Sequence, residues 1–585
     1  MHRSHTSPVI RSGHRRRVIV PALMALVAAA ACGGNDPGAS DATAPATTTA
    51  TETTAPPGGA DAGGDDADVT TTAPPTTQPL LTSPPTTTDP SREPTQGGIL
   101  RVALDAESAG YNPHRDAWAA SGNVVARAVF DSLAVFDASG LPVPYLAETI
   151  EPNEDATVWT ITLRDGITFH NGEVLDADAV RLNFEAALES PQLAGQLASV
   201  ELIEVVDALT VRVEMFEAWA TFPNVLVGDI GAQVGYIVAP EMLGRPDGGR
   251  APIGSGPFRF VEWVPDDRFV VERNDDYWME PVFVDQIVFR PIPDTTSRQA
   301  AFDAGDVDVY VTASTSQIVE YLAAAERGEV NVAIGAPSEP DMVMFNTQAP
   351  PLDDVRVRRA LVMATDIPRI FDYLDAVGVK RPLRGPYDGS SFWYAETDYP
   401  EYDPAGARAL IDEVTAELGS VEFEFAGGQD PFIVGYQELF QSMWAEIGVR
   451  ADIVSLAQGE NIEKALTGGF QVMLWGGVGG GDPDNDFDTF HSGPLNFAQF
   501  ATPEIDAAMQ AGRAVGDPEQ RREQYAIVQR ALGEAVPYIW VGTNQFAMIT
   551  NPSVRGAGEF TLPDGSPGQS ILGGRYYLKD VWVDG

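Results

Sequence analysis

Apolar residues are distributed along the 585-residue chain in three different ways. From Val18 to Ala31 they form a nearly unbroken run, and from residue 33 to 96 large apolar side chains are almost absent. From Gly97 onward they recur at the spacings of strands and helices. The pattern therefore predicts one long folded region preceded by two segments that do not fold with it.

The first half of the folded region alternates between strand and helix periodicity. Residues 99–104 have a weak strand alternation, and Trp159, Ile161 and Leu163 alternate as in a half-buried strand. Turns are predicted at residues 165–166 and 171–172, where Asp-Gly and Asn-Gly stand. Two helices are predicted. One carries Val124, Ala128 and Leu133 on a single face, and the other begins at the N-cap Asp176 and carries Val180, Phe184 and Leu188.

Clear start and stop signals mark the elements of the second half. Asp403-Pro404 and Asp517-Pro518 each combine an N-cap with a proline at the first helical position, and Gly419 and Gly448 stop helices. Strands are predicted at residues 421–425, 449–456 and 538–541. Strands that alternate with helices at this spacing predict an α/β lobe.

The N-terminal segments have the features of an export signal and a linker. Basic residues at positions 11–17 precede the apolar run, which is too short for a bilayer of about 30 Å but suits a signal peptide. Residues 29–32, Ala-Ala-Ala-Cys, resemble a bacterial lipobox, which implies lipidation of Cys32. Residues 33–96 are rich in Thr, Pro, Ala, Gly and Asp and predict a disordered tether. The sequence leaves the Sec or Tat export route and glycosylation of the tether open.

Composition narrows the classes of function. The chain has 84 Asp+Glu and 37 Lys+Arg, a net charge of −47, so we expect no nucleic-acid partner. Cys32 is the only cysteine, which excludes an intrachain disulfide and a cysteine-ligated metal site. The length predicts two to four domains.

The sequence offers little for an enzyme, a metal or a nucleotide. G-x-S-x-G does not occur, and His114, His170 and His491 are far apart. The glycine run around Val478 fits neither G-x-G-x-x-G nor a Walker motif, so we expect no cofactor. The aspartates of 482–488 imitate the start of a calcium loop, but Phe487 replaces the required glycine and Gly493 the final glutamate. We favour aspartates that cap a helix starting near Asp484.

Several motifs resemble one family of transport proteins. They are WTITLRDGITFHNGEVLDADAVRLNFE from residue 159, GSGPF from 254, QAAFDAGDVD from 299, Phe345-Asn346, and DDVRVRRALVMATD from 353. Together they resemble the extracellular solute-binding proteins of family 5, which serve oligopeptide, dipeptide and nickel ABC importers. The resemblance covers residues 97–585.

The resemblance implies a discontinuous α/β fold. It is that of a two-lobed periplasmic binding protein, type II, cluster C, with an extra subdomain in the first lobe. Lobe I would comprise 97–125, 246–345 and 546–585, its subdomain 126–245, and lobe II 346–545. The chain would cross between the lobes near Phe345 and Gln545.

The resemblance also implies a binding site. The family aspartate that binds a peptide α-amine would fall at Gly477, Val478 or Gly479, after Trp475 and before Asp482-Pro483. Two alternatives follow: Asp482 or Asp484 substitutes for it, or the solute lacks an N-terminal amine. The remaining candidate ligand-binding residues are Tyr111, Asn346, Tyr387 and Trp393, whose aromatic or amide groups suit a cleft.

The function implied is that of a monomeric lipoprotein on the extracytoplasmic face of the cell membrane. It would capture an oligopeptide-like or other small polar solute and deliver it to an ABC permease and its ATPase. Three alternatives stay open: a non-peptide solute such as an oligosaccharide, a sensory or adhesive envelope lipoprotein, and, less favoured, a cell-envelope hydrolase.

Overall fold

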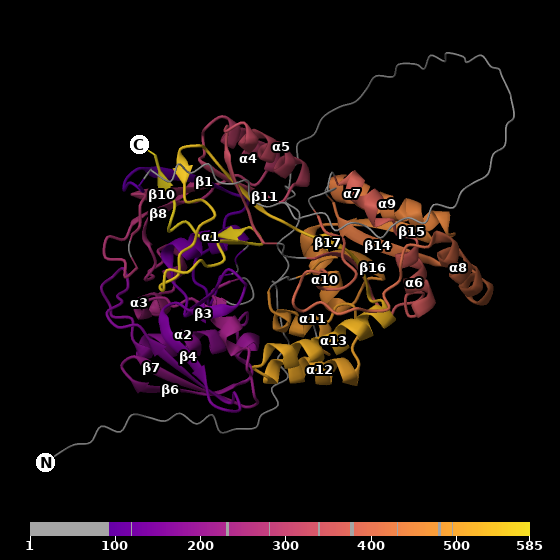
Figure 1. The fold of residues 1–585 in the computed structure, drawn as a ribbon, viewed down its shortest axis with the longest axis horizontal. Helices are drawn as coiled ribbons and strands as arrows, with labels where there is room; N and C mark the ends of the chain where they lie inside the picture. Colours follow the sequence, from indigo (N-terminus) through magenta and orange to yellow (C-terminus); the bar gives the residue numbers. More distant parts are fainter. Residues whose placement is uncertain are drawn as a thin grey trace.

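The structure, a computed structural model, describes residues 93–584 except 117, 119, 230–232, 280, 337–339, 375–379, 430, 478–480 and 494. Cys32, the predicted signal peptide and nearly all of the predicted tether lie outside the described residues. The rest forms two lobes, drawn in purple and magenta on the left and in orange on the right of Figure 1. The C-terminal segment, in yellow, returns to the first lobe.

The first lobe is built on a seven-stranded mixed sheet. Its strand order is β12-β18-β11-β1-β10-β9-β8, with β1 parallel to both of its neighbours. The strands are β1 Ile99–Leu104, β8 Phe258–Val264, β9 Arg268–Arg273, β10 Gln286–Pro291, β11 Val309–Thr312, β12 Asn331–Ile334 and β18 Ala547–Thr550. The helices of this part are α1 Ala120–Val129, α4 Thr295–Asp303 and α5 Thr315–Glu326.

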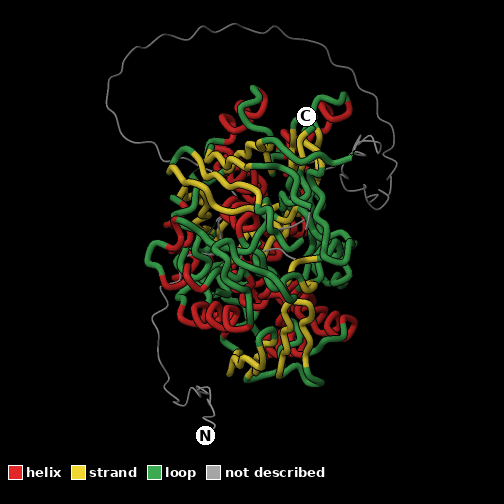
Figure 2. Tube along the Cα trace, turned by 90° about the vertical axis from the view of Figure 1, so that its left-hand side faces the viewer, coloured by secondary structure: helices red, strands yellow, loops and turns green. Residues whose placement is uncertain are grey.

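A four-stranded antiparallel sheet forms a second layer of the first lobe. Its order is β4-β5-β7-β6, and α2 Ala177–Glu189 contacts β6 and β7. The strands are β4 Ala147–Pro152, β5 Val158–Leu163, β6 Val200–Asp207 and β7 Thr210–Met215. Alternate residues of β5 are buried, Trp159, Ile161 and Leu163 among them, as the period-2 pattern predicts. Figure 2 shows this sheet below and the seven-stranded sheet above.

The second lobe surrounds a five-stranded sheet of order β15-β14-β16-β13-β17. The strands are β13 Pro340–Phe345, β14 Glu422–Gly428, β15 Arg450–Leu456, β16 Val472–Gly476 and β17 Tyr538–Thr543. The helices are α6 Val355–Met363, α7 Ile367–Tyr373, α8 Pro404–Leu418, α9 Pro431–Glu446, α10 Gln458–Thr467, α11 Phe487–Phe490, α12 Pro503–Ala514 and α13 Pro518–Ala535. Strands and helices alternate here, so the predicted α/β architecture is confirmed.

Short elements connect these layers. They are β2 Ala134–Phe136, β3 Pro142–Pro144, β19 Val554–Arg555, β20 Ile571–Leu572, β21 Arg575–Tyr576, β22 Trp582–Val583, α3 Pro240–Gly244, and the 3₁₀ turns η1 Ala194–Leu197, η2 Phe222–Leu226, η3 Gln233–Gly235, η4 Gly248–Arg250 and η5 Pro483–Asp486.

Most predicted helix boundaries are confirmed. The Asp176, Asp403 and Asp517 side chains each accept a backbone N–H of the first turn. Gly419 ends α8 at φ +97°, a conformation that favours glycine. The first predicted helix is shorter than expected: α1 ends at Val129, and Leu133 is buried beyond it.

The chain crosses between the two large sheets twice, and the first crossing lies before its predicted position. It falls between Ile334 and Pro340, because β13 already pairs with β16 and β17 in the second sheet. Phe345 is therefore a buried residue at the end of β13. The second crossing lies between Thr543 and Ala547, around Gln545. The Gly335 N–H donates to the Phe546 carbonyl at 2.8 Å, which joins the two crossing segments.

Candidate functional site

Trp475 and Gly477 lie where the second sheet meets the crossing segments. Trp475 is the penultimate residue of β16 and is half-buried, with its ring edge-on to Phe497 at a centroid distance of 5.5 Å. The Gly477 N–H donates to the Pro340 carbonyl at 2.9 Å. A Cβ at Gly477 would lie 2.5 Å from Pro340 Cγ, so the rigid Pro340 ring leaves room only for glycine at this position. Val478 and Gly479 lie outside the described residues.

A polar cluster that the sequence did not predict lies where the chain crosses between the lobes. Lys380 is ion-paired with Asp341, the second residue of β13, and donates to Asn544 Oδ1 at 2.7 Å. Asn544 Nδ2 in turn donates to Asp341 Oδ1 at 2.9 Å. These three residues are 39 to 203 positions apart, and no local motif marks them. They tie Lys380 to β13 and to the residue that follows β17.

Asp482 is committed to a buried ion pair. Both of its carboxylate oxygens accept from the Arg521 guanidinium of α13, with Arg521 Nη1 to Oδ2 at 2.7 Å. Asp482 Oδ1 also accepts the Asp484 N–H at 2.9 Å, so it caps η5. Asp482 is 3% exposed. The prediction that an aspartate caps a helix near Asp484 is therefore confirmed, with Asp482 as the cap.

Asp484 is also paired, but its partners lie in both lobes. Its Oδ1 accepts from Arg513 Nε of α12 at 2.8 Å, and its Oδ2 accepts the Thr221 hydroxyl of the first lobe at 2.6 Å. The Trp219 indole N–H lies 3.5 Å from the same oxygen. With an arginine on each carboxylate, neither Asp482 nor Asp484 offers an uncompensated charge to a solute.

Asp486 and Tyr387 form a separate pair. The Tyr387 hydroxyl donates to Asp486 Oδ2 at 2.9 Å, and both side chains are half-buried. Burial raises the pKa of Asp486 to about 6, and the charge of Asp482 acts in the same direction. Among the described residues no arginine or lysine is paired with Asp486. Asp488, the fourth aspartate of the segment, is exposed.

Trp393 and Asn346, two other predicted site residues, have structural partners. Trp393 is buried edge-on to Tyr525, and its indole N–H donates to the Gly481 carbonyl at 2.7 Å. The Asn346 amide donates to the Gly468 and Phe470 carbonyls, both at 3.0 Å.

Tyr111 lies in the core of the first lobe and is 1% exposed, between Trp118, Trp263 and Phe269. The structure thus brings Tyr387 and Trp393 together with residues 481–486, whereas Tyr111 is apart from them.

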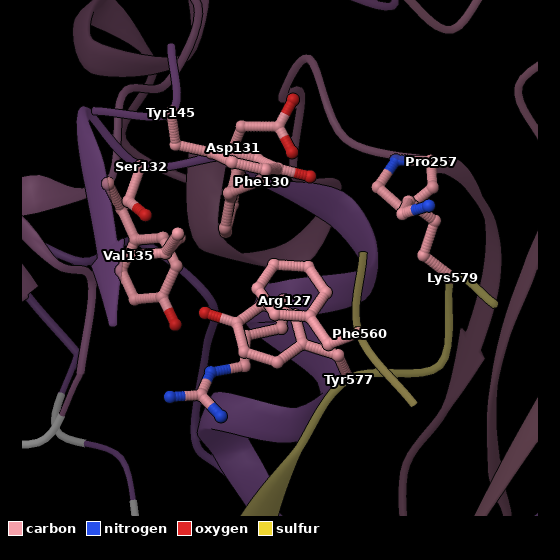
Figure 3. Close-up of a pocket in the computed structure, with 11 residues that line it drawn as sticks. Arg127, Phe130, Asp131, Ser132, Val135, Tyr145, Pro257, Phe560, Tyr577 and Lys579 are labelled. Carbon is pink, nitrogen blue, oxygen red and sulfur yellow. The ribbon is translucent and has the colours of Figure 1, made fainter. Parts of the chain in front are cut away.

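The first of two small cavities lies inside the first lobe (Figure 3). Its volume is about 10 Å³, and its lining includes Arg127, Asp131, Phe560, Tyr577 and Lys579. Tyr277, Trp278 and Ser255 all donate to the Asp131 carboxylate, and burial raises the pKa of Asp131 to about 6. The second cavity, beside Tyr387 in the second lobe, is equally small. Each has room for about one water molecule, so neither holds a solute of the expected size.

The described residues offer neither a metal-binding cluster nor a membrane-spanning helix. Within the described ranges, His, Cys, Asp and Glu side chains do not gather in groups of three that would suit a metal ion. Of the helices in those ranges, none is long and apolar enough to span a bilayer.

Comparisons with known proteins place the chain in a family. Residues 142–496 match the family model described as "Bacterial extracellular solute-binding proteins, family 5 Middle". The chain is 27% identical over 495 residues to di/tripeptide-binding protein 3 of Pseudomonas aeruginosa, covering 78% of this chain and 91% of that protein. It is 26% identical over 488 residues to heme-binding protein A of Haemophilus influenzae, covering 76% and 87%.

Solved structures of binding proteins share the fold of this chain. The structure of the periplasmic binding protein DppA from Helicobacter pylori, in complex with the peptide STSA, superposes with a TM-score of 0.70 at 20% identity. That match covers 84% of this chain and 99% of DppA. The predicted two-lobed binding-protein fold is therefore confirmed. The chain belongs to the bacterial extracellular solute-binding proteins of family 5.

Proposed function

We propose that the solute binds between the two lobes, against the part of the second lobe formed by Trp475, Gly477, Tyr387 and Asp486. One observation carries this placement: Trp475 is half-buried at the end of β16, beside the crossing segments that join the lobes. A half-exposed indole offers an apolar wall to a solute, and clefts between lobes are common ligand sites. The division of the folded chain into lobe I, its subdomain and lobe II is likewise proposed.

The solute is a small polar compound that is not held by an α-amine at Asp482 or Asp484. Both carboxylates are already neutralised, by Arg521 and Arg513. A buried, bidentate arginine leaves little attraction for a second cation. Relatives of this chain are named for di/tripeptides and for heme, so the family accommodates peptide and non-peptide solutes. The paired aspartates favour the non-peptide alternative, with Asp486 as the carboxylate that has no arginine partner in the part of the chain that the structure describes.

Native mass spectrometry tests both statements. The full chain with Cys32→Ser is purified without denaturation, and the solute it carries is released and identified. We expect a bound mass that is lost in Trp475→Ala and kept in Phe392→Ala, an aromatic residue that is 45% exposed. Equal retention in both variants would remove Trp475 from the site. A peptide among the released compounds would overturn the statement on the amine.

We further propose that the protein is a monomeric lipoprotein anchored through Cys32 on the extracytoplasmic face of the membrane. The support is the sequence alone: the apolar run that ends at Cys32, and the tether of residues 33–96. The function is transport rather than catalysis, with an ABC permease and ATPase as partners. We expect Cys32→Ser to release the protein from the membrane fraction, with loss of the diacylglyceryl mass. An unchanged membrane fraction would contradict the anchor.

A further inference from the structure

A compact set of contacts joins the two lobes near the four-stranded sheet of the first lobe. We call it the interlobe latch, which comprises Trp219, Ala220 and Thr221 of the first lobe and Asp484, Phe487 and Arg513 of the second. Figure 1 shows α12 at the bottom of the second lobe, on the side that faces the first lobe. The participants Thr221 and Asp484 are 263 residues apart in sequence.

Asp484 is the centre of the latch. Its carboxylate accepts from Thr221 at 2.6 Å in one lobe and from Arg513 at 2.8 Å in the other. The Trp219 indole N–H donates to the Thr221 hydroxyl at 3.0 Å and so orients it toward the carboxylate. Asp484 is 7% exposed and Thr221 is 5% exposed. A hydrogen bond to a carboxylate in such a water-poor place is stronger than one between neutral groups.

Arg513 supplies the second half of the latch. Its guanidinium carbon lies 3.6 Å from the ring centroid of Phe487 and 5.3 Å from that of Trp219. Its backbone carbonyl accepts the Ala220 N–H at 2.8 Å. The contacts with Trp219 and Ala220 join the two lobes, whereas those with Phe487 and Asp484 stay within the second lobe. The latch therefore combines a carboxylate, a cation over aromatic rings and a backbone hydrogen bond.

We propose that the latch sets the equilibrium between open and closed lobes, with Asp484 as its positioning residue. The contacts between lobes exist only while the lobes are together. They therefore lower the free energy of the closed arrangement relative to the open one. They are made by the chain itself, so closure does not rest on the solute alone. This inference rests on the proposed binding of solute between the lobes. The latch changes the affinity for solute by changing the fraction of molecules whose lobes are closed.

Thr221→Val tests the latch with a matched control. Valine keeps the shape of threonine but removes the hydroxyl that reaches Asp484. Thr365 is the control: it is equally buried, its hydroxyl also accepts a tryptophan N–H, from Trp444 at 3.2 Å, and all its partners are in the second lobe.

Spin labels at Val206→Cys and Leu418→Cys, on exposed positions of the two lobes, report the interlobe distance in the full chain with Cys32→Ser. Double electron-electron resonance measures that distance.

We expect Thr221→Val and Asp484→Asn to raise the open-to-closed ratio by about tenfold, the effect of losing one charge-assisted hydrogen bond. Thr365→Val should leave the ratio unchanged. An unchanged distance distribution in Thr221→Val would overturn the latch. So would an equal shift in Thr365→Val. Native mass spectrometry of Trp475→Ala keeps the two proposals apart, because a wrong solute site would leave the bound mass of that variant unchanged, whatever the distances in Thr221→Val show.

Discussion

At the scale of single residues, the aspartates at alternate positions from 482 to 488 have four different environments. Asp482 pairs with Arg521, Asp484 with Arg513 and Thr221, Asp486 with the Tyr387 hydroxyl, and Asp488 is exposed. The sequence predicted that aspartates cap a helix starting near Asp484, and it offered Asp482 or Asp484 as a solute-binding residue. It could not predict the partners, because these come from α13, α12, η2 and the loop around Tyr387.

Removal of the Asp482 charge should destabilise the protein. Asp482→Asn leaves Arg521 buried without its counter-charge, and breaking a buried pair in this way costs about 3 kcal/mol of the free energy of unfolding. Urea denaturation measures the loss. Asp488→Asn, in the same segment but exposed, should leave the free energy of unfolding nearly unchanged.

The same variant tests the site. If folded Asp482→Asn keeps its solute with unchanged affinity, Asp482 has a purely structural role, as its pairing with Arg521 predicts. A large loss of affinity at unchanged stability would instead return Asp482 to the binding site.

His114 should make stability depend on pH. It is 4% exposed, its Nε2 lies 3.0 Å from Asn183 Oδ1, and burial lowers its pKa to about 4, from an ordinary value near 6.5. The unfolded chain therefore binds a proton between pH 6.5 and pH 4 that the folded chain does not, and stability is lost as the pH falls.

The effect of His114 is isolated by comparison with His114→Gln. From pH 7 to pH 4.5 the wild type should lose about 2 kcal/mol more of its free energy of unfolding than the variant. Buried carboxylates such as Asp131 are present in both proteins and cancel in the difference. Parallel pH profiles would show that His114 is not buried in its neutral form.

At the scale of elements, local signals predicted most boundaries. Asp-Pro starts, glycine stops and the alternation in β5 act within a few residues, so they can be read from the sequence. The errors occurred where tertiary contacts decide. α1 ends at Val129 although the apolar period continues to Leu133, and β13 joins the second sheet because β16 and β17 pair with it.

The end of α8 provides a test at this scale. Gly419 has φ +97°, where a side chain is strained, and no heavy atom lies within 4 Å of an added Cβ. Gly419→Ala should therefore cost about 1 kcal/mol through backbone strain alone. Gly493→Ala is the control, because Gly493 is equally open but does not have a positive φ. Equal melting temperatures of the two variants would contradict the strained C-cap.

At the scale of the whole molecule, the resemblance predicted two lobes, whereas the physics of the sequence predicted only an α/β lobe. The relation between the lobes depends on residues such as Thr221 and Asp484, or Gly335 and Phe546, that are distant in sequence. Such pairs leave no periodic or local signal. The sequence therefore named candidate site residues in the second lobe, which stay a prediction, and it did not predict the contacts of Asp484 with the first lobe.

The central claim, that the solute is enclosed between the lobes, is best tested with a disulfide across them. A Cβ added at Gly140 would lie 3.5 Å from the Cα of Gly481, close enough for a disulfide between Gly140→Cys and Gly481→Cys. Gly140 has φ +82°, so the Gly140→Cys single variant controls for strain. The protein, with Cys32→Ser, is oxidised, dialysed and examined by native mass spectrometry with and without reductant. We expect the oxidised protein to release its solute more slowly during dialysis than the reduced protein. Equally fast release from both would contradict the central claim.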